Sequence, residues 1–333
     1  MELAAIRRSA CAGIVHFASA LMLATFATAV VAQAYPSRPV RMIIPFPPGG
    51  STDTYARIIS PKLSEALGQQ VVIDNRPGAG GALGAELAAK APADGYTIWL
   101  GQTANLVMGP ILRAKGGNYD PVRDFAPITL LMKSPQVMVV STGSPIKTAK
   151  DLIAAAKKSP GTLTFGSAGI GSSGHINGEL FNQVAGINIT HVPYKGGAAA
   201  IVDLMGNRIT YLATSLASAG QFVRDGKLRA IATTGLKRAR VMPDVPTMAE
   251  SALPGYEVVS WHGLLAPAKV PQTIINRLNK DLVALLATQD VQKLLFAEGG
   301  EISPSSPEEF SKFLSHETTK WGKVIKQAGI TAD

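Results

Sequence analysis

Short apolar runs alternate with amphipathic segments along most of this chain. Apolar runs rich in β-branched residues are typical of buried strands, and they occupy residues 38–45, 70–75, 96–100, 128–141, 189–192, 208–214, 228–235 and 258–268, with a further short run before Gly166. Apolar positions repeated every three to four residues predict helices over residues 51–67, 82–90, 148–158, 271–286 and 307–329, after Gly174, and up to Met205. Residues 241–256 are Pro-rich and are expected to be irregular. This alternation predicts an α/β protein with a parallel sheet and ligands outside its carboxyl edge.

Two of the apolar segments are longer than a single strand needs. Residues 128–141 are interrupted by Lys133, Ser134 and Pro135, and residues 258–268 return the chain to its first strands. A chain of 333 residues is also long enough for two domains. We therefore expect two α/β lobes with two crossings between them, the first lobe formed by residues 35–134 plus 260–333 and the second by residues 135–259. The loops that follow the strands would line the cleft.

The first 34 residues differ from the rest of the chain. Arg7 and Arg8 precede an uncharged apolar stretch that ends at Val31, and Ala32-Gln33-Ala34 follows. This order of a charged region, an apolar region and small residues predicts a secretory signal peptide over residues 1–34, and hence a periplasmic protein. An uncleaved membrane anchor is the alternative, because the apolar stretch is somewhat long.

Composition narrows the classes of function. Cys11 is the single cysteine and lies inside the predicted signal peptide, so the mature chain has no disulfide, cysteine metal site or cysteine nucleophile. Without Glu2, Arg7 and Arg8 the chain keeps 30 basic and 22 acidic residues, a formal net charge of +8. This charge favours small anionic partners. The basic residues are scattered without interleaved aromatic residues, so we expect no nucleic-acid partner.

The segment IIPFPPGGSTDTYAR, residues 43–57, combines a strand end, a glycine turn and a helix start. Its prolines end the strand, and Ser51 and Thr52 suit the start of a helix. A helix N-terminus offers unpaired N–H groups and a positive dipole end, so this loop predicts a receptor for a carboxylate or phosphate oxygen. Asp53 is unusual beside an anion; we expect it to cap its own helix, with a bound amine or water as the alternative.

A second glycine-rich loop spans Gly166 to Gly174. Its GIGSSG sequence formally matches G-x-G-x-x-G, but the next strand ends in Tyr194 and Lys195 rather than in the acidic residue that holds a ribose, so we do not expect a dinucleotide. The serines do not form G-x-S-x-G, and His175 is too near Ser173 in one helix start for a Ser-His pair. We interpret the loop as a cradle for ligand oxygens.

The remaining histidines and one lysine have weaker signals. His191, His262 and His316 show no ligand spacing with one another or with carboxylates, so no metal site is predicted. His262 follows Trp261 in the return segment, where it either packs or lies near a hinge. Lys195 is the only basic residue in a predicted cleft loop, and it is either a ligand or interlobe contact or a solvated side chain.

Six motifs in order along the mature chain carry a family resemblance. They are PFPPGGSTD, DNRPGAGG, FGSAGIGSSGHINGELF, HVPYKGG, GKLRAIATTGLKRARVMPDVPTMAES and WHGLLAP. Together they resemble the Bug proteins, the extracytoplasmic substrate-binding subunits of tripartite tricarboxylate transporters. The resemblance implies a two-lobed periplasmic-binding-protein fold, a Venus flytrap that holds a carboxylate-bearing ligand between its lobes. It also implies no catalysis, no cofactor, and delivery of the solute to membrane transporter subunits.

Carried over residue by residue, the resemblance implies ligand contacts from both lobes. In the first lobe these are Phe46, Gly50, Ser51, Thr52, Asp53, Gln102, Thr103 and Asn105, and in the second Ser167, Gly171, Ser172, Ser173, His175, Tyr194, Lys195 and Gly196. Family members often have Asn-Pro where this chain has Gly109-Pro110. The segment that follows the strand ending at Leu100 is also less typical of the family. The ligand's identity, a dicarboxylate, a tricarboxylate or an aromatic acid, therefore stays open.

Three functions remain after this comparison. The leading one is a non-catalytic solute receptor, expected to be a monomer. A variant of it is a ligand-loaded sensor that docks to a membrane kinase. An exported hydrolase that uses Ser173 is the alternative from a different class.

Overall fold

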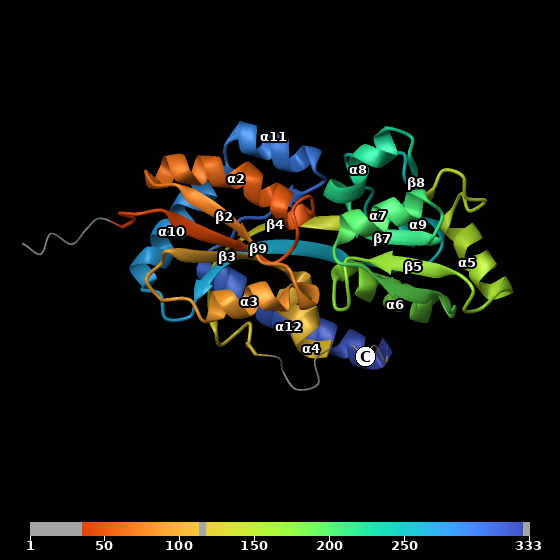
Figure 1. Ribbon diagram of the computed structural model, residues 1–333, viewed down its shortest axis with the longest axis horizontal. Helices are drawn as coiled ribbons and strands as arrows, with labels where there is room; N and C mark the ends of the chain where they lie inside the picture. The colour runs from red at the N-terminus through yellow and green to blue at the C-terminus, as the bar shows by residue number, and fades with distance from the viewer. Residues whose placement is uncertain (1–34, 113–117, 329–333) are drawn as a thin grey trace, which may run out of the picture. The chain divides into compact units, whose positions relative to one another are not determined.

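The structure is a computed structural model that describes residues 35–112 and 118–328 (Figure 1). The predicted signal peptide lies outside the described residues. From Arg38 onward the chain forms one unit, organised around the 17-residue strand β4 (Phe125–Ser141). The partners of β4 change between Pro135 and Gln136, so this one strand belongs to two sheets.

The first sheet holds the strands from the two ends of the chain. Its order is β2 (Val71–Asn75), β1 (Val40–Ile44), β3 (Thr97–Gln102), β9 (Val259–Pro267) and the first part of β4, with β10 (Glu301–Ile302) on the other edge of β4. Strands β2, β1 and β3 are parallel, whereas β9 runs antiparallel to both β3 and β4. We call this sheet and the helices on it the first lobe.

The second sheet continues from the end of β4. Strands β6 (Thr190–Pro193), β5 (Thr164–Ser167) and β7 (Tyr211–Ser215) are parallel, and β7 and β8 (Leu228–Thr233) run antiparallel to β4. We call this sheet and its helices the second lobe. The expectation of a parallel sheet is therefore wrong at the centre, because β4 carries the chain out of the first lobe and β9 brings it back in the opposite direction.

The two crossing segments form one antiparallel pair rather than two separate connections. Lys133 pairs with Trp261, Ser134 with Ser260, and Pro135 with Val259. Both segments therefore lie side by side at the junction of the lobes.

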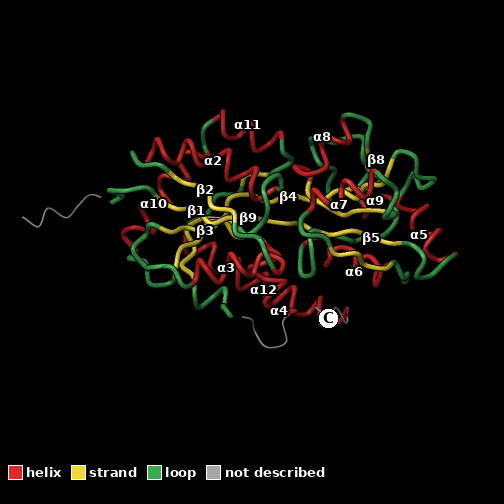
Figure 2. Tube along the Cα trace, viewed as in Figure 1, coloured by secondary structure: helices red, strands yellow, loops and turns green. Residues whose placement is uncertain are grey.

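Helices cover both faces of both sheets (Figure 2). In Figure 1, α2 and α11 lie above the first sheet and α3 and α12 below it, while α7 and α8 lie above the second sheet and α6 below. The helices are α2 (Ser51–Leu67), α3 (Ala82–Ala89), α4 (Gly109–Leu112), α5 (Ala149–Lys158), α6 (Ser173–Ala185), α7 (Gly197–Met205), α8 (Leu216–Arg224), α9 (Met248–Ser251), α10 (Gln272–Leu286), α11 (Gln289–Ala297) and α12 (Pro307–Ala328). A 3₁₀ turn, η1 (Ala79–Gly81), precedes α3, and a π-helical turn, η2 (Ala104–Met108), follows β3.

Most predicted elements are present, and α2 has the predicted bounds. The sequence does not predict helices α4, α8, α9 and α11. Helix α8 has no loop before it, because Ser215 ends β7 and its Oγ then accepts the N–H of Ser218 at 3.1 Å as the helix cap. In α6, Ile176 and Phe181 are buried, whereas the apolar side chain of Val184 is exposed.

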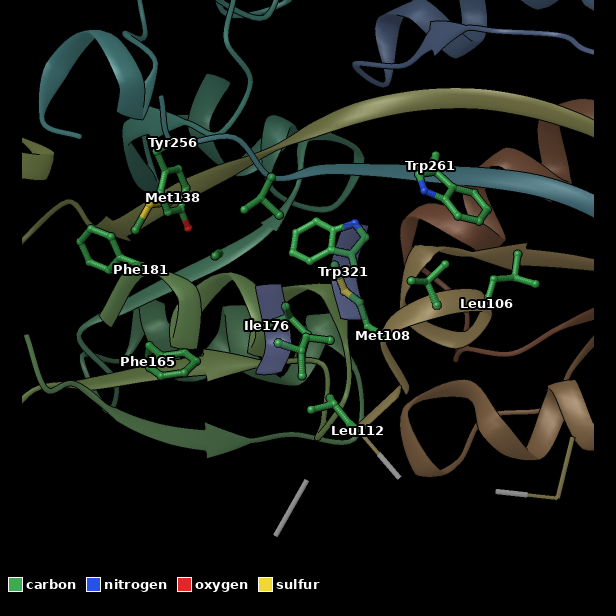
Figure 3. Close-up of a cluster of buried hydrophobic side chains, with 14 of the residues drawn as sticks. Leu106, Met108, Leu112, Met138, Phe165, Ile176, Phe181, Tyr256, Trp261 and Trp321 are labelled. Carbon is green, nitrogen blue, oxygen red and sulfur yellow. The ribbon is translucent and has the colours of Figure 1, made fainter. Parts of the chain in front are cut away.

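The hydrophobic core joins the lobes through α12. Trp321 of α12 belongs to the same buried cluster as Met108 of the first lobe and Ile176 of the second (Figure 3). At the end of α12, the carbonyl of Gln327 accepts a hydrogen bond from Gln183 Nε2 of α6 at 2.9 Å. The lobes are thus linked by a packed helix in addition to the two crossing strands.

Candidate ligand-binding site

A cavity of about 110 Å³ lies between the lobes. Pockets for drug-sized ligands typically measure about 300–1,000 Å³, so this cavity fits a small molecule. Its lining comes from strand-exit loops, helix starts and the crossing strands. The lining residues are Phe46, Pro47, Pro48, Gly50, Ser51, Thr52, Gln102, Gln136, Ala168, Ser172, Ser173, Gly174, Lys195, Gly196, Gly197, Ala198, Ala199, Ala213, Thr214, Ser215, Ser218 and Ser260.

Four helix N-termini contribute to this lining, those of α2, α6, α7 and α8. Glycine precedes α2 and α7, and no side chain caps either helix. At α6 and α8, Ser172 and Ser215 each accept one backbone N–H with their own hydroxyl. The first turns of α2 and α7 therefore keep N–H donors for a ligand, and the four positive dipole ends favour a negative charge.

The lobes approach one another closely at two glycines. At Gly196, with φ +123°, a Cβ would lie 3.1 Å from Cγ of Pro47 in the first lobe. At Gly80, with φ +63°, a Cβ would collide with the carbonyl oxygen of Ile170 in the second lobe. Only glycine combines these backbone angles with such close contact between loops.

The cavity lining contains a positively charged side chain and no negatively charged one. Lys195 is the only ionisable side chain among the lining residues, and it is exposed at the cavity edge. Asp53 is buried in the first turn of α2 but does not line the cavity. Its carboxylate binds Arg57 Nε at 2.9 Å, the N–H of Gly49 at 3.1 Å and Asn75 Nδ2 at 3.0 Å.

These bonds determine the role of Asp53. Burial by itself raises the pKa of the Asp53 carboxyl, but the hydrogen bonds from Arg57, Gly49 and Asn75 outweigh burial and hold that pKa below its usual value. Asp53 therefore stays ionised and holds the glycine loop against α2. The expectation that Asp53 caps its own helix is wrong, because α2 has no side-chain cap and the Asp53 carboxylate accepts the N–H of Gly49 in the loop before the helix.

The cavity brings together many of the residues that the sequence indicated. Those in the lining are Phe46, Gly50, Ser51, Thr52, Gln102, Ser172, Ser173, Lys195 and Gly196. Those outside it are Asp53, Thr103, Asn105, Ser167, Gly171, His175 and Tyr194.

The residues outside the lining mostly hold the loops beside it. Asn105 Oδ1 accepts the N–H of Gln102 at 2.9 Å, and Thr103 Oγ1 accepts the N–H of Trp261 at 2.8 Å. Tyr194 donates its hydroxyl proton to Asp203 at 2.8 Å and so faces away from the cavity. These side chains hydrogen-bond to other parts of the protein and do not line the cavity.

Two histidines pack beneath the loop from Gly166 to Gly174. The rings of His175 and His191 stack with centroids 4.1 Å apart. His175 Nδ1 accepts the N–H of Gly171 at 3.1 Å, and His191 Nε2 lies 2.7 Å from Ser167 Oγ. Burial lowers the pKa of each histidine to about 4, and the neighbouring His175 adds to the shift at His191. Both rings are therefore neutral at pH 7.

His262 on β9 is buried and supports a cavity residue. Its Nε2 lies 3.3 Å from Thr52 Oγ1, and its ring packs edge-on against Tyr55. Burial lowers the pKa of His262 to about 3, so this ring is neutral as well. Sequence left open whether His262 packs or lies near a hinge, and the structure shows that it packs on the crossing strand β9.

Sequence reasoning missed two groups of polar lining residues. Thr214, Ser215 and Ser218 lie where β7 passes into α8, and their hydroxyls repeat the pattern seen at the other strand ends. Gln136 and Ser260 lie on the crossing strands. The available signal for the first group was its position at a strand end, and for the second it was a polar residue beside apolar positions of a long strand segment.

The described residues show two further absences. Within residues 35–112 and 118–328, no cluster of three or more His, Cys, Asp or Glu side chains has the arrangement of a metal site. No helix in the same part of the chain has the length and hydropathy needed to span a membrane.

Comparison with known protein families gives a match over most of the chain. A family model described as "Tripartite tricarboxylate transporter family receptor" matches residues 55–330. The chain is 40% identical to "UPF0065 protein in tcbD-tcbE intergenic region" of Pseudomonas sp. over 329 residues, which cover 98% of this chain and 96% of that protein. It is 34% identical to protein BugT of Bordetella pertussis over 306 residues, which cover 92% and 94% of the two chains.

Solved structures show the same fold. The adipate-bound structure of an R. palustris protein matches with a TM-score of 0.86 at 36% identity, covering 89% of this chain and 99% of that one. The periplasmic binding protein BugD matches with a TM-score of 0.85 at 34% identity, covering 89% and 99%. MatC of Rhodopseudomonas palustris with bound malate matches with a TM-score of 0.83 at 31% identity, covering 87% and 100%. The expected two-lobed periplasmic-binding-protein fold is confirmed.

Proposed function

Because the chain belongs to the tripartite tricarboxylate transporter receptor family, we propose that it is an extracytoplasmic solute-binding protein. It captures a small carboxylate-bearing anion between its lobes and delivers that anion to a tripartite tricarboxylate transporter. The family match and the Bug proteins among the relatives also support the resemblance to Bug proteins that the sequence motifs indicate.

The observation that carries the proposal is the polarity of the cavity. Four helix N-termini and Lys195 contribute positive potential, and the lining contains no carboxylate. A bound carboxylate accepts N–H groups that have no capping side chain at α2 and α7, and it accepts hydroxyl protons from serines of the second lobe. A cation or a neutral apolar ligand gains neither interaction.

The neighbouring structures support a small organic acid. One neighbour was solved with adipate and another with malate. Both ligands carry two carboxylates, and the cavity receives helix N-termini from both lobes. A linear dicarboxylate is therefore the first ligand class to test.

The geometry around Ser173 favours binding over catalysis. Ser173 Oγ is buried and has no hydrogen-bond partner in the described part of the chain, so no base is positioned to activate it. His175 does not serve, because its Nδ1 already accepts the N–H of Gly171. We interpret Ser173 as a hydroxyl donor to the ligand.

Ligand binding is tested by thermal unfolding with succinate, malate, glutarate, adipate and an aromatic acid. At about 100 times the dissociation constant, a true ligand stabilises the protein by roughly 2.7 kcal/mol, which raises the midpoint by several degrees. Replacing Ser173 by Ala removes a hydrogen bond to a charged group and weakens affinity about ten- to a hundredfold. His316, exposed on α12, gives the control His316→Ala with unchanged affinity.

Two results contradict this function. One is the absence of any thermal shift across the carboxylate panel, and the other is turnover of the bound compound. Delivery is tested separately by uptake of the labelled ligand into vesicles that contain the transporter's membrane subunits. We expect uptake only when the ligand-loaded protein is present, whereas a sensor would bind the ligand without supporting uptake.

A further inference from the structure

Two polar side chains of the cavity come from the crossing strands instead of a loop or helix start. Gln136 lies on β4 directly after the strand changes partners, and Ser260 lies on β9. The side chains are almost fully buried, at 3% and 7% exposure, and Gln136 Nε2 donates to Ser260 Oγ at 3.4 Å. They therefore form one polar spot at the junction of the lobes.

A chain of hydrogen bonds from the core fixes the orientation of Gln136. The hydroxyl of Tyr256 donates to Asn177 Oδ1 at 2.9 Å, and Asn177 Nδ2 donates to Gln136 Oε1 at 2.7 Å. The side-chain amide oxygens of Asn177 and Gln136 thus each accept a hydrogen bond from a residue on the core side. The amide N–H groups of Gln136 are left to donate toward Ser260 and the cavity.

Strand pairing does not need this side chain. The backbone N–H of Gln136 donates to Thr234 Oγ1 at 2.8 Å, and its carbonyl accepts the N–H of Thr234 at 2.9 Å. An apolar side chain would satisfy the same ladder without the cost of burying an amide. Ser260 Oγ already accepts from Gln136, so its own proton remains available as a donor.

We propose that Gln136 and Ser260 donate hydrogen bonds directly to the bound anion, so that ligand contact is made on both crossing strands. Tyr256 and Asn177 are positioning residues that keep the N–H side of Gln136 toward the cavity. This inference rests on the proposed function, since it assigns further contacts to the same anion. It also means that the ligand bridges the two segments about which the lobes would move.

The first experiment measures affinity by calorimetry for the tightest ligand among succinate, malate, glutarate and adipate. Ser260→Ala is expected to weaken binding about ten- to a hundredfold. Gln136→Glu keeps the side-chain shape and the acceptor for Asn177, but it directs a negative oxygen at the anion, and we expect at least a hundredfold loss. Ser311→Ala and Gln70→Glu are matched controls at exposed positions outside the cavity, expected to stay within twofold.

The second experiment observes Gln136 in the unmodified protein. The ¹⁵N side-chain amide signals of Gln136, assigned by their loss in Gln136→Met, are expected to shift on addition of the same ligand. In Tyr256→Phe the core loses the donor that orients Asn177, and we expect weaker affinity together with broadened Gln136 amide signals. A purely structural role of Tyr256 would leave those signals sharp.

The outcomes separate this inference from the proposed function. If the unmodified protein binds none of these four acids and no aromatic acid, both fail. If it binds one, but Ser260→Ala and Gln136→Glu match their controls, or the Gln136 amide signals do not move, then the contacts at the crossing strands are wrong and the solute-binding function stands.

Discussion

The indole N–H of Trp261 on β9 donates to Oε2 of Glu317 on α12 at 2.8 Å. The same oxygen accepts the indole N–H of Trp321 at 3.2 Å. Trp261 belongs to a crossing segment, and Trp321 packs in the cluster that reaches both lobes. Glu317 thus ties α12 to the junction of the lobes through one buried carboxylate.

Replacing Glu317 by Gln should destabilise the folded protein. The carboxylate makes hydrogen bonds to two indoles, and losing a charge-assisted bond costs about 1.5–3 kcal/mol of unfolding free energy. Urea unfolding followed by tryptophan fluorescence measures this loss. Glu65 forms an exposed ion pair with Lys62, so the control Glu65→Gln should change the free energy of unfolding by less than about 1 kcal/mol. Equal effects of the two substitutions would contradict the role of Glu317.

Replacing Gly80 by Ala should prevent the observed approach of the lobes. The new Cβ meets the Ile170 carbonyl oxygen of the second lobe, so the ligand-bound form should have a larger radius of gyration and a weaker affinity. Gly68 is the matched control, because its φ of +66° gives similar backbone strain while a Cβ there meets nothing within 4 Å. Small-angle scattering with and without ligand tests both variants. We expect the lobes to close on the ligand by bending at residues 133–135 and 260–263 of the crossing strands, and the same measurement tests this closure.

Identical scattering profiles for Gly80→Ala and the unmodified protein with saturating ligand would show that the two loops accept the added Cβ by a local shift and that the lobes still approach each other. If the radius of gyration of the unmodified protein does not fall when ligand is added, the lobes do not close about the crossing strands.

Replacing Lys195 by Met should slow ligand association. Lys195 is the only charged side chain in the lining and lies at its edge, so it attracts anions over a distance that salt screens. Stopped-flow measurements should show a lower association rate for the variant and a weaker dependence of that rate on ionic strength. Lys62→Met, on the exposed face of α2, is the control. An unchanged rate and salt slope would mean that Lys195 is a solvated side chain.

Acid should destabilise the protein through the stacked histidines. In the folded state the pKa values of His175 and His191 are about 4, against 6.5 for the free side chain. The unfolded chain therefore binds more protons below pH 6.5, and stability falls between pH 6.5 and 4 by up to roughly 1.4 kcal/mol per pH unit per histidine. Above pH 6.5 these residues contribute no pH dependence.

Comparing variants isolates this effect from the carboxyl groups. Burial raises the pKa of Glu179, which lies 3.9 Å from His175 Nε2 and gives the opposite dependence. Urea unfolding at pH 7.5 and 5 should show a smaller loss for His191→Gln than for the unmodified protein, whereas His316→Gln should not differ from it. If all three lose the same stability, the histidine pair is not responsible.

Export should remove the first 34 residues. The small residues at Ala32 and Ala34 follow the apolar stretch, so amino-terminal sequencing of periplasmic material should begin at Tyr35. Ala34→Arg places a large charged residue at the cleavage site and should leave the precursor uncut. Full-length unmodified protein in the membrane fraction would instead indicate an anchor.

The sequence by itself determined the elements whose signals are local. Glycines and Ser51 start α2 where predicted, and Gly68 ends it in a left-handed conformation, because turn and cap preferences act over a few residues. The same local chemistry placed Ser172, Ser173 and Gly196 at helix starts. Since the strands before these helices are parallel, their loops reach one edge of the sheet, and several of them line one cavity.

Only the tertiary structure decided which polar groups meet there. Gln136 and Ser260 are far apart in sequence and reach the cavity because β4 and β9 pair across the junction. Asp53 and His175 have the chemistry of site residues, but they bind Arg57, the distant Asn75 and the Gly171 backbone, and neither lines the cavity. Pairing between distant strands and the burial that follows depend on the whole chain, so no short pattern specifies them.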